Sequence, residues 1–160
     1  MIIRKASIAD VSILLAIIRK SFLEVAEKFE LTIDNCPKSP AFYTTERLKG
    51  DFEKGLTYYI LEEDGRECGC AALERAGADK YYLERLAVLP QHRRKGFGET
   101  LVRYIFEQAR KVGAERLEIG IIAEQKELKK WYGKFGFVEK YTKRFEHLPF
   151  VVAFMSVELS

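Results

Sequence analysis

The stretch LAVLPQHRRKGFGETL, residues 86–101, predicts a strand, a glycine loop and a helix in direct succession. Residues 81–88 are rich in strong β-formers, which predicts the strand. Pro90 turns the chain, and apolar residues at helical spacing then continue as far as Gly113. We therefore expect the loop to open straight into the first turn of a helix.

The loop in this stretch has the chemistry of a phosphate site. The first backbone N–H groups of a helix have no partner inside the helix, and the peptide dipoles place partial positive charge there. Gly96 and Gly98 lack the Cβ atoms that would keep an anion away from those donors. Positive charge is added by Arg93, Arg94 and Lys95. The alternative is a solvated basic loop whose glycines serve turn geometry, and neither the Walker nor the Rossmann glycine pattern is matched.

The hydrophobic period predicts the other elements on both sides of this unit. A period of 3.6 residues predicts helices, and a period of two predicts strands. The expected helices cover residues 8–28, 44–54 and 124–134, and the expected strands cover residues 2–6, 57–62, 67–76, 117–123, 137–143 and 150–159. The order β-α-α-β-β-β-α-β-α-β-β predicts one α/β domain over residues 1–160, with a mixed, mostly antiparallel sheet of about seven strands and helices on both faces.

Charge and composition exclude several classes of protein. The chain has 27 basic and 24 acidic side chains and a net charge of +3, too even a balance for the concentrated basic face of a nucleic-acid-binding protein. No window approaches the roughly 18 consecutive apolar residues of a membrane span, and the first residues lack a secretory signal. We expect a cytoplasmic protein without nucleic-acid or membrane partners.

The cysteines are expected to be free thiols. Cys36, Cys68 and Cys70 are an odd count, and the last two lie too close together for an easy disulfide. No His or further Cys clusters beside them, so we expect no metal site.

Two motifs make the chain resemble the GNAT superfamily of N-acetyltransferases. Arg93-x-x-Gly96-x-Gly98 matches the superfamily's Arg/Gln-x-x-Gly-x-Gly/Ala signature. Farther along the chain, WYGKFGF at residues 131–137 is similar to its Tyr-x-x-x-Gly-Phe landmark. The resemblance extends to the element order of nearly the whole chain, and it implies the acyl-CoA N-acyltransferase fold.

The resemblance implies acetyl-CoA as the acyl donor. Its pyrophosphate would bind the glycine loop, at Arg93, Arg94, Lys95, Gly96, Phe97, Gly98, Glu99 and Thr100. Its pantetheine arm would lie along the preceding strand like an added strand, at Leu86, Ala87 and Val88. The chain departs from the family at Glu124, where many relatives carry an Asn that binds the cofactor, and this puts that one contact in doubt.

The resemblance places Tyr132 at the position of the superfamily's general acid. A phenol has an ordinary pKa of about 10 and a thiol one of about 8.5, so Tyr132 could protonate a leaving thiolate while staying protonated itself at neutral pH. The alternative is that Tyr132 only packs in the core beside Trp131.

Glu84 is the candidate general base, because a carboxylate inside an apolar strand is costly unless it is paired or functional. Strand alternation predicts Tyr82, Glu84 and Leu86 on one face. The base position of some family members lies nearer Tyr82. Two alternatives stay open: a cross-strand ion pair between Glu84 and Arg75, and a water chain acting as the base.

The predicted function is transfer of an acetyl group from acetyl-CoA to a primary amine of a small molecule, peptide or protein, by direct attack in a ternary complex. A non-catalytic acyl-CoA-binding module is the alternative. The acceptor side is expected at residues 22–43 and at the turn 146–149, with His147 in a surface turn. Because many relatives dimerise, the resemblance also implies a homodimer.

Overall fold

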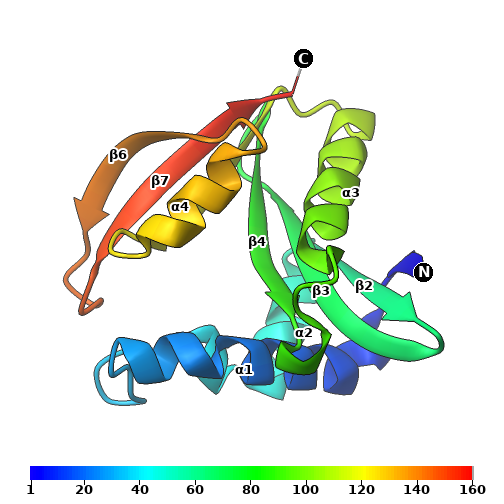
Figure 1. The fold of residues 1–160 in the computed structure, drawn as a ribbon, viewed down its shortest axis with the longest axis horizontal. Helices are drawn as coiled ribbons and strands as arrows, with labels where there is room; N and C mark the ends of the chain where they lie inside the picture. Colours follow the sequence, from blue (N-terminus) through cyan, green and yellow to red (C-terminus); the bar gives the residue numbers. More distant parts are fainter. Residues whose placement is uncertain (160) are drawn as a thin grey trace.

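A computed structural model describes residues 1–159 and has the predicted element order (Figure 1). The helices are α1 (Val11–Lys28), α2 (Thr45–Glu53), α3 (Phe97–Lys111) and α4 (Lys126–Gly133), with short 3-10 helices η1 (Ile8–Asp10), η2 (Pro40–Phe42) and η3 (Pro90–His92). The strands are β1 (Ile2–Lys5), β2 (Thr57–Glu63), β3 (Arg66–Arg75), β4 (Lys80–Val88), β5 (Arg116–Ile122), β6 (Val138–Arg144) and β7 (Val151–Glu158). The predicted α/β class is confirmed.

The helix boundaries differ from the prediction at two places. The segment after Ser7 begins as the 3-10 helix η1, closed by a capping box between Ser7 and Asp10, and α1 starts only at Val11. The predicted loop at residues 31–42 ends in the 3-10 helix η2, which Ser39 caps. Both are single tight turns that are stabilised locally by hydrogen bonds from side chains. The spacing of apolar residues therefore does not predict them.

The seven strands form one sheet in the order β1-β2-β3-β4-β5-β7-β6. Neighbouring strands are antiparallel except β4 and β5, which are parallel and pair only between Lys80–Tyr82 and Arg116–Glu118. Beyond these residues the two strands diverge. In Figure 1, β4 and β7 come together near the C-terminus and spread apart toward α1. The sheet is therefore split in its middle, and the edge of β4 that faces β5 is open along most of its length.

Helices cover both faces of the sheet, as predicted. On one face, Leu101 and Ile105 of α3 pack with Leu83 and Leu117 in a core cluster that also contains Tyr132 of α4. On the other face, α1 and α2 contribute to a second cluster; it includes Leu14, Ile18, Leu48, Ile60 and Ala72. Burial of these apolar side chains fixes which face of each strand each helix covers.

The predicted alternation along β4 is wrong at its middle. Ala72 is opposite Glu84 and Cys70 is opposite Ala87, so β4 carries an extra residue across from Ala71. Arg85 absorbs this bulge in the left-handed region, with φ of 48°. As a result Leu86 packs in the α3-side cluster, whereas Glu84 lies on the α2 side with Ala72.

Candidate active site

A cavity of about 1140 Å³ occupies the gap where β4 and β5 diverge. Its floor is formed by residues 82–88 of β4 and residues 118–122 of β5. It continues along α1 on one side and past the glycine loop to α4 on the other. Among the predicted cofactor residues, all line this cavity except Lys95 and Thr100, and Tyr132 and Glu84 line it as well. The volume exceeds the roughly 300–1,000 Å³ typical of a pocket for one small ligand.

The glycine loop presents unpaired amides to this cavity. Gly96 caps α3 in the left-handed conformation, with φ of 81°, and Arg94 is left-handed too, with φ of 64°. The first amide of the helix with an acceptor is that of Thr100, which donates to the Gly96 carbonyl at 3.1 Å. The amides of residues 97–99 precede it and point out of the helix end. They provide donors for an anion, as expected, but Thr100 is engaged within the helix through both its amide and its hydroxyl.

Arg93 fastens the loop to α1 instead of pointing freely at a ligand. Its Nε donates to the carbonyl of Val88 at 3.1 Å, and its guanidinium also donates to the carbonyl of Ser21 at 3.0 Å. The same group forms an ion pair with Glu24 at 3.0 Å. Arg93 therefore holds the loop in place, and the free positive charge of the loop comes from the exposed Arg94 and Lys95.

Gly98 is required by packing as well as by ligand access. A Cβ atom at this position would lie 3.2 Å from the indole ring of Trp131. Trp131 belongs to α4, so its indole ring reaches across from α4 to the first turn of α3. The two GNAT-like motifs of the sequence, far apart in the chain, thus meet at this contact.

Tyr132 both packs in the core and lines the cavity. Its ring stands edge-on to Trp131 and Phe137, with ring centroids 5.0 Å and 5.5 Å away. The side chain is buried, and burial raises the pKa of its hydroxyl. The phenol therefore stays protonated across the physiological pH range and can act only as a proton donor there. The packing alternative is real, but it does not separate Tyr132 from the cavity.

Glu84 pairs with Arg85 and not with Arg75. Its Oε2 lies 3.1 Å from Arg85 Nη2, whereas Arg75 donates to the carbonyl of Gly77 at 2.9 Å. The expected cross-strand pair is wrong because Ala72, not Arg75, is opposite Glu84. Side chains of consecutive residues normally point to opposite faces of a strand, and the bulge at Arg85 brings these two together. Burial raises the pKa of Glu84 to about 7, with Arg85 opposing this rise and Glu74 adding to it.

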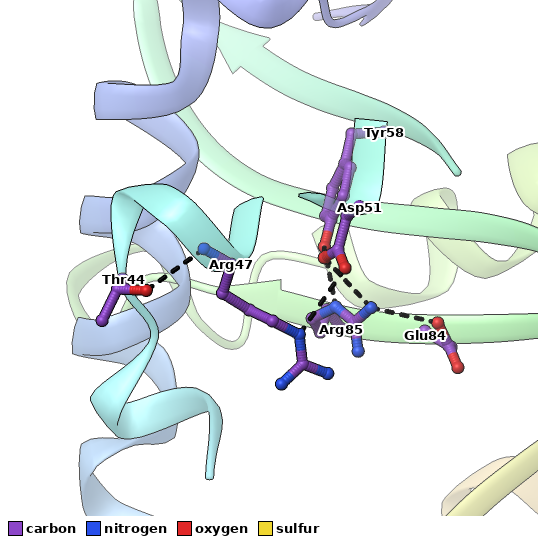
Figure 2. Close-up of polar contacts among 6 residues, drawn as sticks. All are labelled: Thr44, Arg47, Asp51, Tyr58, Glu84 and Arg85. Carbon is purple, nitrogen blue, oxygen red and sulfur yellow. Dashed lines mark hydrogen bonds and ion pairs between the residues drawn. The ribbon is translucent and has the colours of Figure 1, made fainter. Parts of the chain in front are cut away.

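A buried polar network surrounds Arg85 on its side away from Glu84 (Figure 2). Arg85 donates from Nε to the hydroxyl of Tyr58 at 2.7 Å and from Nη2 to Asp51 at 3.2 Å. Tyr58 in turn donates to the same Asp51 oxygen at 2.7 Å. Asp51 is only 1% exposed and sits on α2, whose start is capped by Thr44. The network anchors the strained bulge of β4 to α2 and β2.

Asp51, Tyr58 and Arg85 were not predicted from the sequence as part of the site. One signal was present: Asp51 lies three residues after Leu48, on the buried stripe of α2. An acid on such a stripe indicates a buried partner.

Asp51→Asn is expected to lower the free energy of unfolding by about 3 kcal/mol, because removing one partner of a buried ion pair leaves the other charge poorly compensated. Guanidinium chloride denaturation measures this change. Glu53→Gln is the matched control, since Glu53 is an exposed residue of the same helix, and it should change the free energy by less than about 0.5 kcal/mol. A loss below about 1 kcal/mol for Asp51→Asn would contradict the stabilising role of the network.

The two segments expected to build the acceptor side pack against each other. Leu31, Cys36 and Ala41 form a small core cluster, and Leu148 and Phe150 from the β6–β7 connection contact it. His147, which was expected in a surface turn, is exposed, lies beside Phe145 and does not line the cavity. Of the residues expected here, those that line the cavity come from α1 and the segment after it, and none belongs to the turn 146–149. Val152 and Phe154 of β7 line the cavity instead, and they were not expected there.

Metal ligands and membrane spans are not found in residues 1–159. No group of three or more His, Cys, Asp or Glu side chains is arranged to hold a metal ion there. All three cysteines are buried free thiols, as predicted. No helix in this part of the chain is long and apolar enough to cross a membrane.

The fold and the cavity define an α/β protein that can hold an anionic ligand at the start of α3 and an extended ligand arm along β4. A model of the Acetyltransferase (GNAT) family matches residues 22–137. The chain therefore belongs to the GNAT family, and the resemblance of the two motifs is confirmed.

Individual relatives agree with this assignment. The chain is 40% identical over 81 residues to the amino-acid acetyltransferase of Neisseria meningitidis, covering 50% of this chain and 18% of that protein. It thus spans about a fifth of that relative's length. It is 29% identical over 109 residues to the uncharacterized N-acetyltransferase YsnE of Bacillus subtilis, covering 67% of this chain and 70% of that protein.

A solved structure shares the fold over nearly the whole chain. The PaiA N-acetyltransferase of Thermoplasma acidophilum, crystallised in complex with coenzyme A, superposes with a TM-score of 0.78 at 20% identity, covering 99% of both chains. The predicted fold family is confirmed by this likeness.

Proposed function

We propose that this protein transfers an acetyl group from acetyl-CoA to a primary amine. The observation that carries the proposal is the single cavity that joins the free amides of the α3 N-terminus, the open edge of β4, Tyr132 and Glu84. Membership of the GNAT family supports the same reaction. The coenzyme A complex of the structurally similar PaiA N-acetyltransferase supports the same donor.

The donor's anionic and amide groups match two parts of the cavity. The loop amides and the positive charge of Arg94 and Lys95 suit a pyrophosphate. The main chain of β4 near Leu86 suits the amides of a pantetheine arm, because that edge has no neighbouring strand beyond Tyr82. The carbonyl of Val88 already accepts from Arg93, so Leu86 is the better main-chain partner of the two.

Acetyl-CoA bound in this way supplies a thioester carbonyl to the middle of the cavity. Glu84 accepts a proton from the acceptor ammonium, directly or through water, which frees the nitrogen lone pair to attack the carbonyl carbon. As the carbon–sulfur bond breaks, Tyr132 donates its hydroxyl proton to the sulfur, which leaves as a thiol. One of the two protons on the attacking nitrogen then passes to the Tyr132 oxygen, which restores the tyrosine, and Glu84 releases the proton it accepted to solvent.

Glu84 is expected to give the pH profile an acid limb. A base works only when it is ionised, and the pKa of Glu84 is raised to about 7, so kcat/KM should rise with pH and level off above about pH 7. Glu84→Gln should lower kcat/KM about 100-fold and remove this limb. Initial rates of thiol release between pH 5.5 and 9 measure both effects.

Glu74→Gln is the matched control for this profile. The carboxylate of Glu74 helps to raise the pKa of Glu84, so its removal should move the midpoint of the limb to lower pH without abolishing activity. An unchanged limb in Glu84→Gln would assign it to another group, and a water chain would then be the better candidate for the base.

The proposed function itself is tested by thiol release. Acetyl-CoA is incubated with the protein and a panel of primary amines, and free thiol is measured against a reaction without amine. The proposal expects release that requires an amine. Binding of coenzyme A without any amine-dependent release would instead support a non-catalytic acyl-CoA-binding module.

Two further expectations stay proposals. Residues 1–160 are proposed to form one acetyltransferase domain, and the chain is proposed to form a homodimer. Light scattering of the purified protein measures the second directly.

A further inference from the structure

The acceptor half of the cavity has apolar walls. These walls are formed by α1, by the loop after it, and by β7 together with the residue just before it. The side chains that form them are Phe22, Val25, Leu31, Phe150, Val152 and Phe154. Three of them are aromatic. Such walls gain free energy by covering an apolar group and none by covering a hydrated one.

The charged groups of this half are acidic or already paired. Glu84 and Glu118 both line it, and Glu118 forms an ion pair with Lys80 at 3.4 Å. Arg85 is the one basic side chain from the floor of the described cavity, and its guanidinium is shared between the carboxylates of Asp51 and Glu84. Figure 2 shows its head group directed toward Asp51 and Tyr58.

The other basic side chains that line the cavity come from η3, the glycine loop and the end of α4. They are His92, Arg93, Arg94 and Lys134. Arg93 is paired with Glu24, and Lys134 lies over the ring of Trp131, which packs against Gly98. His92 and Arg94 adjoin the glycine loop proposed for the pyrophosphate and the other two are already engaged, so none of these side chains is left for an acceptor.

We propose that the acceptor is a primary amine attached to an apolar, preferably aromatic, group and lacking a carboxylate. The proposal rests on the acetyl transfer proposed above. The ammonium group of such an amine is attracted by Glu84, and its apolar part is covered by the aromatic walls. A free amino acid would place its carboxylate among carboxylates and apolar side chains without a partner, which is costly. Acceptor choice is thereby inferred to differ from that of the amino-acid acetyltransferase to which the chain is similar.

A matched set of acceptors tests this directly. 2-Phenylethylamine, L-phenylalaninol and L-phenylalanine share the amine and the ring, and they carry a hydrogen, a hydroxymethyl group and a carboxylate at the same carbon. We expect similar kcat/KM for the first two and a value about 100-fold lower for phenylalanine. L-Glutamate should be no better than phenylalanine. Equal or greater use of phenylalanine or glutamate would overturn the proposal.

Binding is measured separately from turnover. With coenzyme A present, 2-phenylethylamine should raise the Tm further and phenylalanine should not. If this difference is seen but no acceptor releases thiol, the proposed acetyl transfer fails while the choice of ligand stands. If coenzyme A raises the Tm but 2-phenylethylamine neither binds nor reacts, the acceptor proposal fails.

A pair of neighbouring variants locates the effect in the cavity. Phe22→Ala removes part of the aromatic wall and should raise the KM for 2-phenylethylamine about tenfold. Leu23→Ala is the control, because Leu23 is 48% exposed and does not line the cavity. It should leave the KM unchanged. A retained coenzyme A shift in both variants reports an intact fold, and equal KM values in the two would count against the proposed acceptor wall.

Discussion

Gly96→Asp is expected to abolish the rise in Tm that coenzyme A gives the wild-type protein. The new carboxylate would stand at the start of α3, where the pyrophosphate is proposed to bind, and would repel it while filling the space beside the amides. A ligand at about 100 times its Kd stabilises by about 2.7 kcal/mol, which for a domain of this size is a Tm shift of roughly 5–10 °C. Thermal denaturation with and without coenzyme A measures the loss.

Gly113→Asp is the matched control for this variant. Gly96 and Gly113 have nearly the same left-handed backbone, with φ of 81° and 84°, and an added Cβ would meet no atom within 4 Å at either position. Both variants therefore carry similar backbone strain, but Gly113 lies at the far end of α3. A full coenzyme A shift in Gly113→Asp and none in Gly96→Asp is the expected pair of results. A full shift in both would remove the loop from the proposed binding site.

Gly98→Asp is a less clean test of the same site. A Cβ atom there already approaches Trp131 at 3.2 Å, so the substitution disturbs the contact between α3 and α4 even without ligand. Its Tm is expected to fall in the absence of coenzyme A, and loss of the ligand shift would then have two causes.

Tyr132→Phe is expected to lower kcat about 1,000-fold while leaving the coenzyme A shift unchanged. A general acid contributes a factor of about 100 to 10,000 to the rate, and the phenylalanine ring keeps the packing against Trp131 and Phe137. Burial raises the pKa of Tyr132, so the hydroxyl is available as a donor throughout the measurable pH range. Steady-state thiol release at saturating acetyl-CoA gives the comparison.

Tyr104→Phe controls for the loss of a tyrosine hydroxyl elsewhere. Tyr104 is a residue of α3 whose ring stands edge-on to Tyr59, and it does not line the cavity. Its kcat should stay within a factor of two of the wild type. A wild-type kcat in Tyr132→Phe would leave Tyr132 with its packing role alone, and protonation of the thiolate would then fall to solvent.

Local signals in the sequence predicted most of the fold. Helical periods, caps and glycine stops gave α1, α2 and α3 within a few residues of their observed ends, since amphipathic helices are determined largely by their own side chains. The glycine loop could be predicted in the same way, because Pro90, the glycines and the helix that follows are consecutive in the chain. The α4 landmark, although distant, was recognisable as a motif of its own.

The bulge in β4 was beyond such local signals. Arg85 adopts a left-handed conformation that an arginine seldom takes, and the partners that compensate it lie 27 and 34 residues earlier, at Tyr58 and Asp51. The regular alternation of side chains along a strand therefore predicted the wrong face for Leu86. It also left Arg75 as the expected partner of Glu84, which is wrong. The face and the ion-pair partner of Glu84 depend on tertiary contacts, which exist only in the assembled sheet.

Transfer of a labelled acetyl group to an amine would demonstrate the proposed reaction itself. Acetyl-CoA carrying carbon-13 in its acetyl group is incubated with the protein and 2-phenylethylamine, phenylalaninol and a wider amine panel, and the products are analysed by mass spectrometry. We expect labelled N-acetyl product together with one free coenzyme A thiol per product formed. If the label stays on coenzyme A with every amine, although coenzyme A still raises the Tm of the protein, the proposed acetyl transfer is wrong.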